Sequence, residues 1–153
     1  MIKRLCLAAT VLALSAADAA ACTILMPPPA EGDTLEQSVW RREAAYQRHL
    51  RQTVSHVYVG RVVATGRNFR FEPITVIKGP RPPRWVFVPS HGTCGPAPEV
   101  GQVRLVFAEH LNGEEFPGQP WNWGRMAVLH SVRLDQVADP GLATVLRARG
   151  VVR

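Results

Sequence analysis

The chain has 153 residues, of which 46% are hydrophobic and 20% charged, and its formal net charge is +6. This composition is typical of one compact soluble domain, and it excludes collagen-like repeats, a polytopic membrane protein and a large α/β barrel. Only three cysteines are present, so a dense disulfide scaffold is excluded as well.

The first 21 residues have the pattern of a secretory signal peptide. Lys3 and Arg4 form a basic start, and the apolar run over 5–17 is too short to cross a bilayer easily. Cleavage after Ala19 and cleavage after Ala21 both fit the small residues that follow. A retained N-terminal anchor helix is the alternative, but the second basic flank that it needs is missing.

We expect residues 22–153 to form a single exported domain, secreted or periplasmic, because no later stretch is apolar enough to span a bilayer. Two basic residues and one acidic residue leave with the signal, so the net charge falls from +6 to +5. The remaining arginines are scattered along the chain. A solvated, mildly cationic surface is the default interpretation of this charge.

The number of cysteines left after signal removal predicts a disulfide. Cys6 leaves with the signal, and Cys22 and Cys94 remain, which are expected to bond in an oxidising compartment. The bridge closes a loop of about 70 residues and contributes roughly 4 kcal/mol on the chain-entropy model. Metal binding would need more ligands at short spacing. A lipoprotein signal ending at Cys22 is the other alternative, and lipid on the sulfur would leave Cys94 unpaired.

The mature chain opens with an extended, proline-rich lead over 23–32, followed by a predicted helix over 34–53. We expect Asp33 to cap this helix, with Glu36 completing a capping box. Neither glycine nor proline interrupts the run before Gly60. The residues expected on the apolar face are Leu35, Val39, Tyr46, Leu50 and Val54, and those expected mostly on the outer face are Arg41, Arg42, Glu43, Arg48 and Arg51.

Short runs of β-branched and aromatic residues, separated by turn residues such as Gly66 and Asn68, then predict five strands. Asp139 followed by Pro140 predicts a short final helix that ends near Gly150. The fold class expected is mainly β (α+β), a five-stranded OB-like barrel with an N-terminal helix and a short C-terminal helix. The predicted strands are His56–Ala64, Phe69–Ile77, Trp85–Val88, Val103–Ala108 and Met126–Leu129.

Several motifs in this order resemble a known family. The start Cys22-Thr23 with Pro27-Pro28 looks like the opening of tissue inhibitors of metalloproteinases, and later segments resemble bacterial netrin-module proteins. The resemblance covers about Cys22 to Ala108 and implies an OB-like barrel whose N-terminal cysteine is bridged to a Cys-Gly loop. The later segments are Val57–Val63, Phe71–Gly79, Thr93–Gly95 and Gly101–Ala108.

The same resemblance implies a mode of inhibition. In the animal inhibitors the α-amine and carbonyl of the first cysteine chelate the protease zinc, and the next side chain enters the specificity pocket; by position these are Cys22 and Thr23 here. A catalytic zinc keeps an open coordination position that such a chelator can fill. The second cysteine of the animal opening is replaced by Ile24.

No enzyme motif, cofactor motif or intrinsic metal site is evident. The histidines form none of the metal-binding spacings and are expected to be solvated or to lie at the core edge. Three aromatic residues share one polar loop, where they either form an exposed recognition patch or fold back to cap the barrel, and the need of a small domain for buried area favours the cap. The histidines are His49, His56, His91, His110 and His130, and the aromatic residues are Phe116, Trp121 and Trp123.

Three functions fit these observations. The first is a non-enzymatic, secreted or periplasmic binding or structural module with an unknown partner. The second is a metalloprotease inhibitor acting through Cys22 and Thr23. The third is a binder of anionic envelope polysaccharide or lipid, which suits the +5 charge. Export to the cell envelope argues against nucleic acid as the partner.

Overall fold

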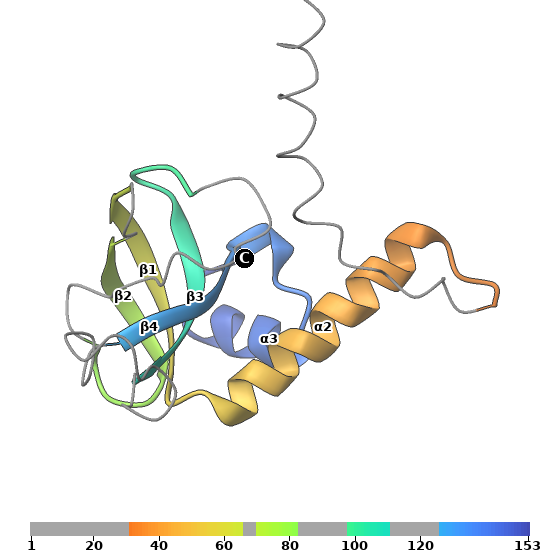
Figure 1. Cartoon of the computed structure of the whole chain (residues 1–153), viewed down its shortest axis with the longest axis horizontal. Helices are drawn as coiled ribbons and strands as arrows, with labels where there is room; N and C mark the ends of the chain where they lie inside the picture. The colour runs from red at the N-terminus through yellow and green to blue at the C-terminus, as the bar shows by residue number, and fades with distance from the viewer. Residues whose placement is uncertain (1–30, 66–69, 83–97, 111–125) are drawn as a thin grey trace, which may run out of the picture.

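The computed structural model describes residues 31–65, 70–82, 98–110 and 126–153, and these form an α+β fold. Four strands make one antiparallel sheet, with a long helix before it and a short helix after it (Figure 1). In chain order the elements are α2 (Leu35–Thr53), β1 (His56–Ala64), β2 (Arg70–Lys78), β3 (Val103–His110), β4 (Met126–Arg133), the 3-10 helix η3 (Leu134–Gln136) and α3 (Pro140–Ala148).

The sheet has the order β2-β1-β3-β4, with every neighbouring pair antiparallel. The bounds predicted for β1 are confirmed, β2 is shifted by one residue, and β3 and β4 run on to His110 and Arg133. Over the described residues the sheet is open and the expected five-stranded barrel is not seen, because β2 and β4 form its two edges and do not pair. The expected strand Trp85–Val88 lies outside the described residues.

The pairing of β1 with β2 is irregular, and this bends the sheet. The register shifts at three places along β1, and a further shift lies between Phe107 and Ala108 in the β3–β4 pair. Such bulges bend a strand and increase its twist. At Gly60 a Cβ atom would come within 2.9 Å of Tyr58 Cε2 and 3.3 Å of Phe71 Cβ, so a side chain there would crowd the Tyr58 ring and the neighbouring strand.

Both faces of the sheet are buried in apolar clusters. Alternate residues of each strand point to opposite faces, so neighbouring residues such as Val57 and Tyr58 enter different clusters. The cluster under the helices contains Leu50, Val54, Val57, Val59, Leu105, Phe107, Val132, Leu142 and Leu146. The cluster on the other face contains Tyr58, Val62, Phe71, Val106, Ala108, Met126 and Val128.

Helix α2 begins one residue later than the capping prediction placed it. Thr34, not Asp33, is the N-cap: its hydroxyl accepts from the Gln37 backbone N–H, and the Gln37 side chain accepts from the Thr34 backbone N–H. Both positions carry a capping residue followed three positions on by Glu or Gln, so the pattern alone does not choose between them. Asp33 instead forms an ion pair with Arg41.

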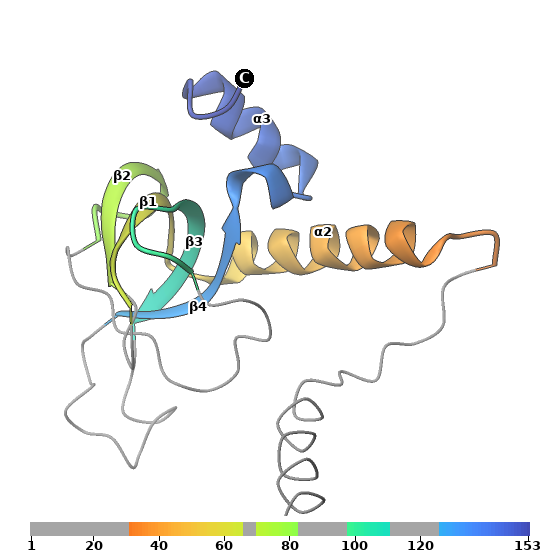
Figure 2. The same ribbon diagram turned by 90° about the horizontal axis from the view of Figure 1, so that it is seen from above.

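The predicted apolar face of α2 is only partly correct. Leu50 and Val54 are buried, whereas the earlier members Leu35, Val39 and Tyr46 are 61%, 41% and 44% exposed. Figure 2 shows why: the N-terminal part of α2, in orange, extends past the sheet and α3. The helix therefore contacts the rest of the protein from about Glu43 onward.

The final helix follows the prediction. Asp139 is the N-cap, with its carboxylate accepting from the Gly141 backbone N–H at 3.0 Å, and Pro140 takes the first helical position. Gly150, just past the helix end, has a positive φ of 67°. Among the described helices, none is long and apolar enough to cross a membrane.

Candidate functional site

A polar pair joins α2 to β4. His130 Nε2 and Glu43 Oε1 are 2.9 Å apart, and the His130 ring meets Tyr46 edge-on with 5.0 Å between the ring centroids. The hydrogen bond from His130 lowers the pKa of Glu43, and burial raises the pKa of Tyr46. Glu43 also accepts from Gln47 Nε2 at 2.7 Å. This carboxylate is thus committed to two internal contacts, which suits an anchor better than an acid–base catalyst.

Gln47 continues the same contact toward the C-terminal segment. It is fully buried, and its Oε1 accepts from the backbone N–H groups of Ala138 at 2.9 Å and Asp139 at 3.2 Å. The Asp139 carboxylate, 1% exposed, lies 3.1 Å from Arg51 Nε on α2. Together these contacts fasten α2 to the start of α3.

A second polar cluster lies where β1 begins and β3 ends. His56 Nδ1 is 2.7 Å from Ser55 Oγ, and the His56 and His110 ring centroids are 5.2 Å apart. Glu109 accepts from the backbone N–H groups of Ser55 at 2.6 Å and His110 at 2.9 Å. Burial, together with the charge of His110, lowers the pKa of His56. Burial would raise the pKa of Glu109, but its hydrogen bonds outweigh this and lower it.

This cluster has the residue types of a hydrolase site but not its arrangement. In a nucleophile–base–acid set the carboxylate holds the histidine, whereas Glu109 holds backbone amides and contacts Ser55. Space is also short: a Cβ on Gly79 would lie 2.3 Å from the Ser55 carbonyl oxygen and 3.2 Å from His56 Cδ2. We therefore interpret the cluster as a clamp between the strand ends.

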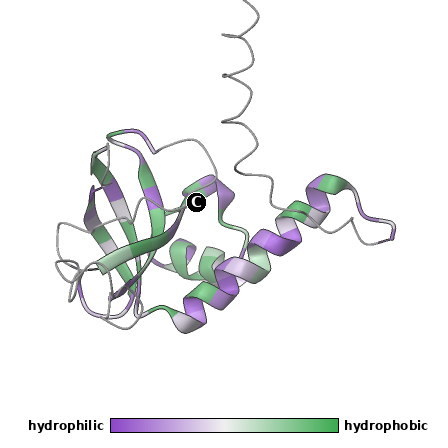
Figure 3. Ribbon diagram, in the orientation of Figure 1, coloured by the Kyte–Doolittle hydropathy of each residue, from purple (hydrophilic) through white to green (hydrophobic). Residues whose placement is uncertain are grey.

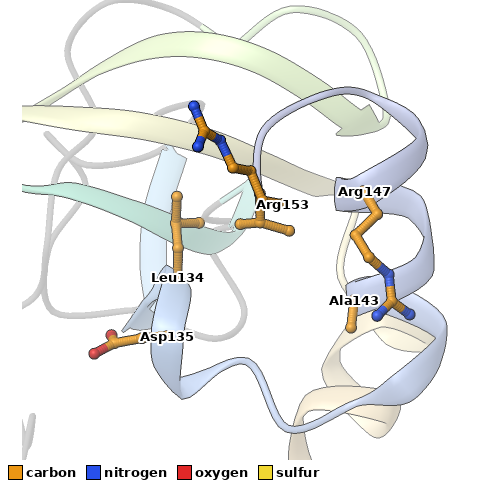
Figure 4. Close-up of a pocket in the computed structure, with 6 residues that line it drawn as sticks. Leu134, Asp135, Ala143, Arg147 and Arg153 are labelled. Atoms are coloured by element: carbon orange, nitrogen blue, oxygen red, sulfur yellow. The ribbon is translucent and has the colours of Figure 1, made fainter.

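A groove opens between η3 and α3 (Figure 4). Leu134 and Ala143 contribute apolar walls, and two guanidinium groups come from α3 and the last described residue. Asp135 points outward and is paired with Arg133, at 2.5 and 3.0 Å, so its charge is already compensated. The full lining is Leu134, Asp135, Ala143, Arg147, Val152 and Arg153.

The residues proposed from sequence for inhibition and for the aromatic patch cannot be placed, because they lie outside the described residues. These are Cys22, Thr23, Cys94, Phe116, Trp121 and Trp123. The disulfide and both roles of the aromatic loop therefore stay predictions. In the described part of the chain, no three His, Cys, Asp or Glu side chains are grouped to hold a metal ion.

The described histidines are distributed as follows. His130 pairs with Glu43, 87 residues away, and His56 packs on His110, while His49 is exposed on α2. The sequence predicted histidines that are either solvated or at the core edge, but neither pairing was predicted. The only available signal was the alternation of side chains along β3 and β4. Alternation predicts which face of the sheet a polar side chain lies on, but not which residue it contacts there.

Comparison of the chain with protein-family models, with curated proteins and with solved structures found no match.

Proposed function

We propose that this chain is an exported, non-enzymatic binding module of the netrin or metalloproteinase-inhibitor type, built on an OB-like barrel. The barrel is supported by the cluster on the sheet face away from the helices. Its seven side chains are 0–4% exposed although neither described helix covers them. A curved sheet whose inner face is closed by a fifth strand, Trp85–Val88, would bury them in this way.

The groove between η3 and α3 carries the functional part of the proposal. Arg147 and Arg153 have no ion-pair or hydrogen-bond partner among the described residues, in contrast to Arg51 and Arg133, which are paired. The segment 140–153 contains three arginines and no acidic side chain. Two free guanidinium groups beside a hollow fit an anionic ligand, because the planar guanidinium binds carboxylate, phosphate and sulfate through paired hydrogen bonds.

The apolar floor of the groove indicates a second property of the ligand. Leu134 and Val152 are half-buried and pack on the core below, so they present a fixed apolar surface. A ligand that combines a negative charge with a short apolar portion would use both features. The proposed role is thus recognition of an anionic partner in the cell envelope, in line with the +5 charge expected after signal removal.

Binding of a fluorescein-labelled peptide of alternating Glu and Leu, followed by fluorescence anisotropy, tests this role. Removing both charges with Arg147→Gln and Arg153→Gln should weaken binding about tenfold or more at low salt. The matched control is Arg48→Gln with Arg61→Gln, which removes the same charge from exposed positions on α2 and β1. An equal loss in the control pair would mean that net charge alone attracts the peptide, and the groove would not be the site.

A further inference from the structure

The sheet face away from the helices carries a buried phenol without a hydrogen-bond partner. Tyr58 is fully buried, and its hydroxyl group forms no hydrogen bond with any described residue. Burial raises the pKa of Tyr58, so the hydroxyl stays protonated and can act as a donor. Buried hydroxyl groups in proteins are nearly always hydrogen-bonded, so Tyr58 indicates that an acceptor belongs at this position.

Arg104 on β3 presents a second donor on the same face. Its Nη1 donates to Gln102 Oε1 at 3.2 Å and its Nη2 donates to the Ser131 carbonyl oxygen at 2.8 Å. Its Nε is buried and has no partner among the described residues. Val106, two residues further along β3, belongs to the same buried cluster as Tyr58, so the alternation of side chains puts Arg104 on this face as well.

Strand pairing brings these two donors to the same end of the sheet. Gly60 on β1 is the direct partner of Arg104 on β3, so their Cα atoms are about 5 Å apart. The Tyr58 ring leans over Gly60, because its Cε2 would lie 2.9 Å from a Cβ at that position. Since Gly60 has no side chain, no side chain of β1 separates the hydroxyl end of the ring from Arg104.

The charge at this end of the face is positive. Arg133 on β4 is the direct partner of Arg104, and like charges in such a cross-strand pair repel each other. Burial lowers the pKa of Arg104, and the charge of Arg133 adds to this effect. Asp135 pairs with Arg133. Within the described part of the chain no carboxylate pairs with Arg104, which therefore keeps an uncompensated positive charge. Figure 3 shows hydrophilic residues interrupting the hydrophobic stretches of the strands.

These features fit one class of ligand. Two donors beside one uncompensated positive charge match a group that accepts two hydrogen bonds and carries one negative charge, which describes a carboxylate. A phosphate dianion would bring more charge and more acceptor atoms than the two donors can serve. Val62 and Phe71 belong to the same buried cluster, so the remainder of the ligand should be short and apolar. The Arg133 side chain is 57% exposed, so this end of the face reaches solvent.

We propose that Tyr58 and Arg104, called here the Tyr58–Arg104 site, bind the carboxylate of a small aliphatic monocarboxylic acid. The Tyr58 hydroxyl donates to one carboxylate oxygen and Arg104 Nε donates to the other. The bound negative charge also offsets the repulsion between Arg104 and Arg133. The site lies on the opposite face of the sheet from the groove between η3 and α3, so it goes beyond the proposed function and does not depend on it.

A side-chain NMR titration of the exported, processed protein with sodium butyrate tests the site. The ¹H–¹⁵N resonances of the arginine Nε–H groups are followed at constant ionic strength. The Arg104 resonance should shift and saturate, because its Nε–H gains an acceptor, whereas the resonance of Arg61, exposed on β1, should not. Sodium chloride that reproduces the full shift would show that salt only screens the two arginines, and tighter binding of sodium phosphate would contradict the carboxylate assignment.

The variant Tyr58→Phe distinguishes a ligand site from a hydrogen bond within the protein. It removes only the hydroxyl, so its Tm without butyrate should equal or exceed that of the wild-type protein, while its Kd for butyrate should rise at least tenfold. Tyr46→Phe changes the only other tyrosine and is the matched control, which should leave the Kd unchanged. A lower Tm of ligand-free Tyr58→Phe, or an unchanged Kd, would overturn the proposal.

Discussion

His56 lies buried at the start of β1, and its ring is the titratable group that links this junction to pH. Burial lowers its pKa below the usual 6.5, with the charge of His110 adding to the effect. Below pH 6.5 the unfolded chain therefore binds a proton more readily than the folded one. The stability that neutral His56 provides is complete above pH 6.5 and is lost as the pH falls through the lowered value.

We expect the urea midpoint of the wild-type protein to decrease when the pH is lowered from 7.5 to 5.5. In His56→Asn this decrease in the midpoint should be smaller. Asparagine can retain the contact with Ser55 Oγ, which His56 makes through Nδ1, but carries no titrating group. Unfolding curves followed by circular dichroism at several pH values measure the slope. An unchanged slope in the variant would show that His56 does not cause the pH dependence. The lowered pKa of Glu43 adds a further loss only below pH 4.5.

At the level of elements, the docking of α2 depends on one buried polar side chain. Gln47 supplies the acceptor for two backbone N–H groups at the start of α3 and donates to the Gln136 carbonyl oxygen at 3.2 Å. A hydrophobic residue at this position would leave these groups buried and unpaired. The cost of an unsatisfied buried group is roughly 1–3 kcal/mol.

Gln47→Leu should therefore lower the free energy of unfolding by about 2–4 kcal/mol, as measured by urea denaturation. Gln52→Leu, at an exposed position of the same helix, is the matched control and should change it by less than about 0.5 kcal/mol. Similar effects in the two variants would mean that helix propensity, and not the bonds to the C-terminal segment, sets the cost.

The sequence predicts the elements better than their partners. The bounds of β1 and the Asp139–Pro140 start of α3 were predictable because strong local signals mark them. Helical periodicity located the apolar face of α2 but not where along the helix the body ends, so Tyr46 was expected inside and is half exposed. Gln47 was missed because a polar residue on an apolar face gives no sign of the backbone groups that it meets 91 residues later.

At the scale of the whole molecule, the two clusters make the sheet the centre of the protein. One face carries the helices and the groove, and the other carries the buried cluster that includes Tyr58 and Phe71. The N-terminal segment is the remaining part of this arrangement. With the predicted Cys22–Cys94 bridge it would be held at its start, which lowers the conformational entropy lost when Cys22 and Thr23 bind a partner.

This organisation gives a sharp test of the metalloprotease-inhibitor alternative. Zinc chelation through Cys22 requires a free α-amine, so inhibition of a zinc protease is expected only from the chain that begins at Cys22, cleaved after Ala21 and without lipid. A form with one additional alanine before Cys22 should lose inhibition in a peptidase assay, because its amine is moved away from the metal. The same form should keep the Tm and the intact mass of the disulfide-bonded protein, since neither the bridge nor the fold requires a free amine. Two freely alkylated thiols in the unreduced protein would rule out the bridge. Equal inhibition by the extended and native forms would show that Cys22 does not chelate zinc, and an inhibitory role would then need a different contact surface.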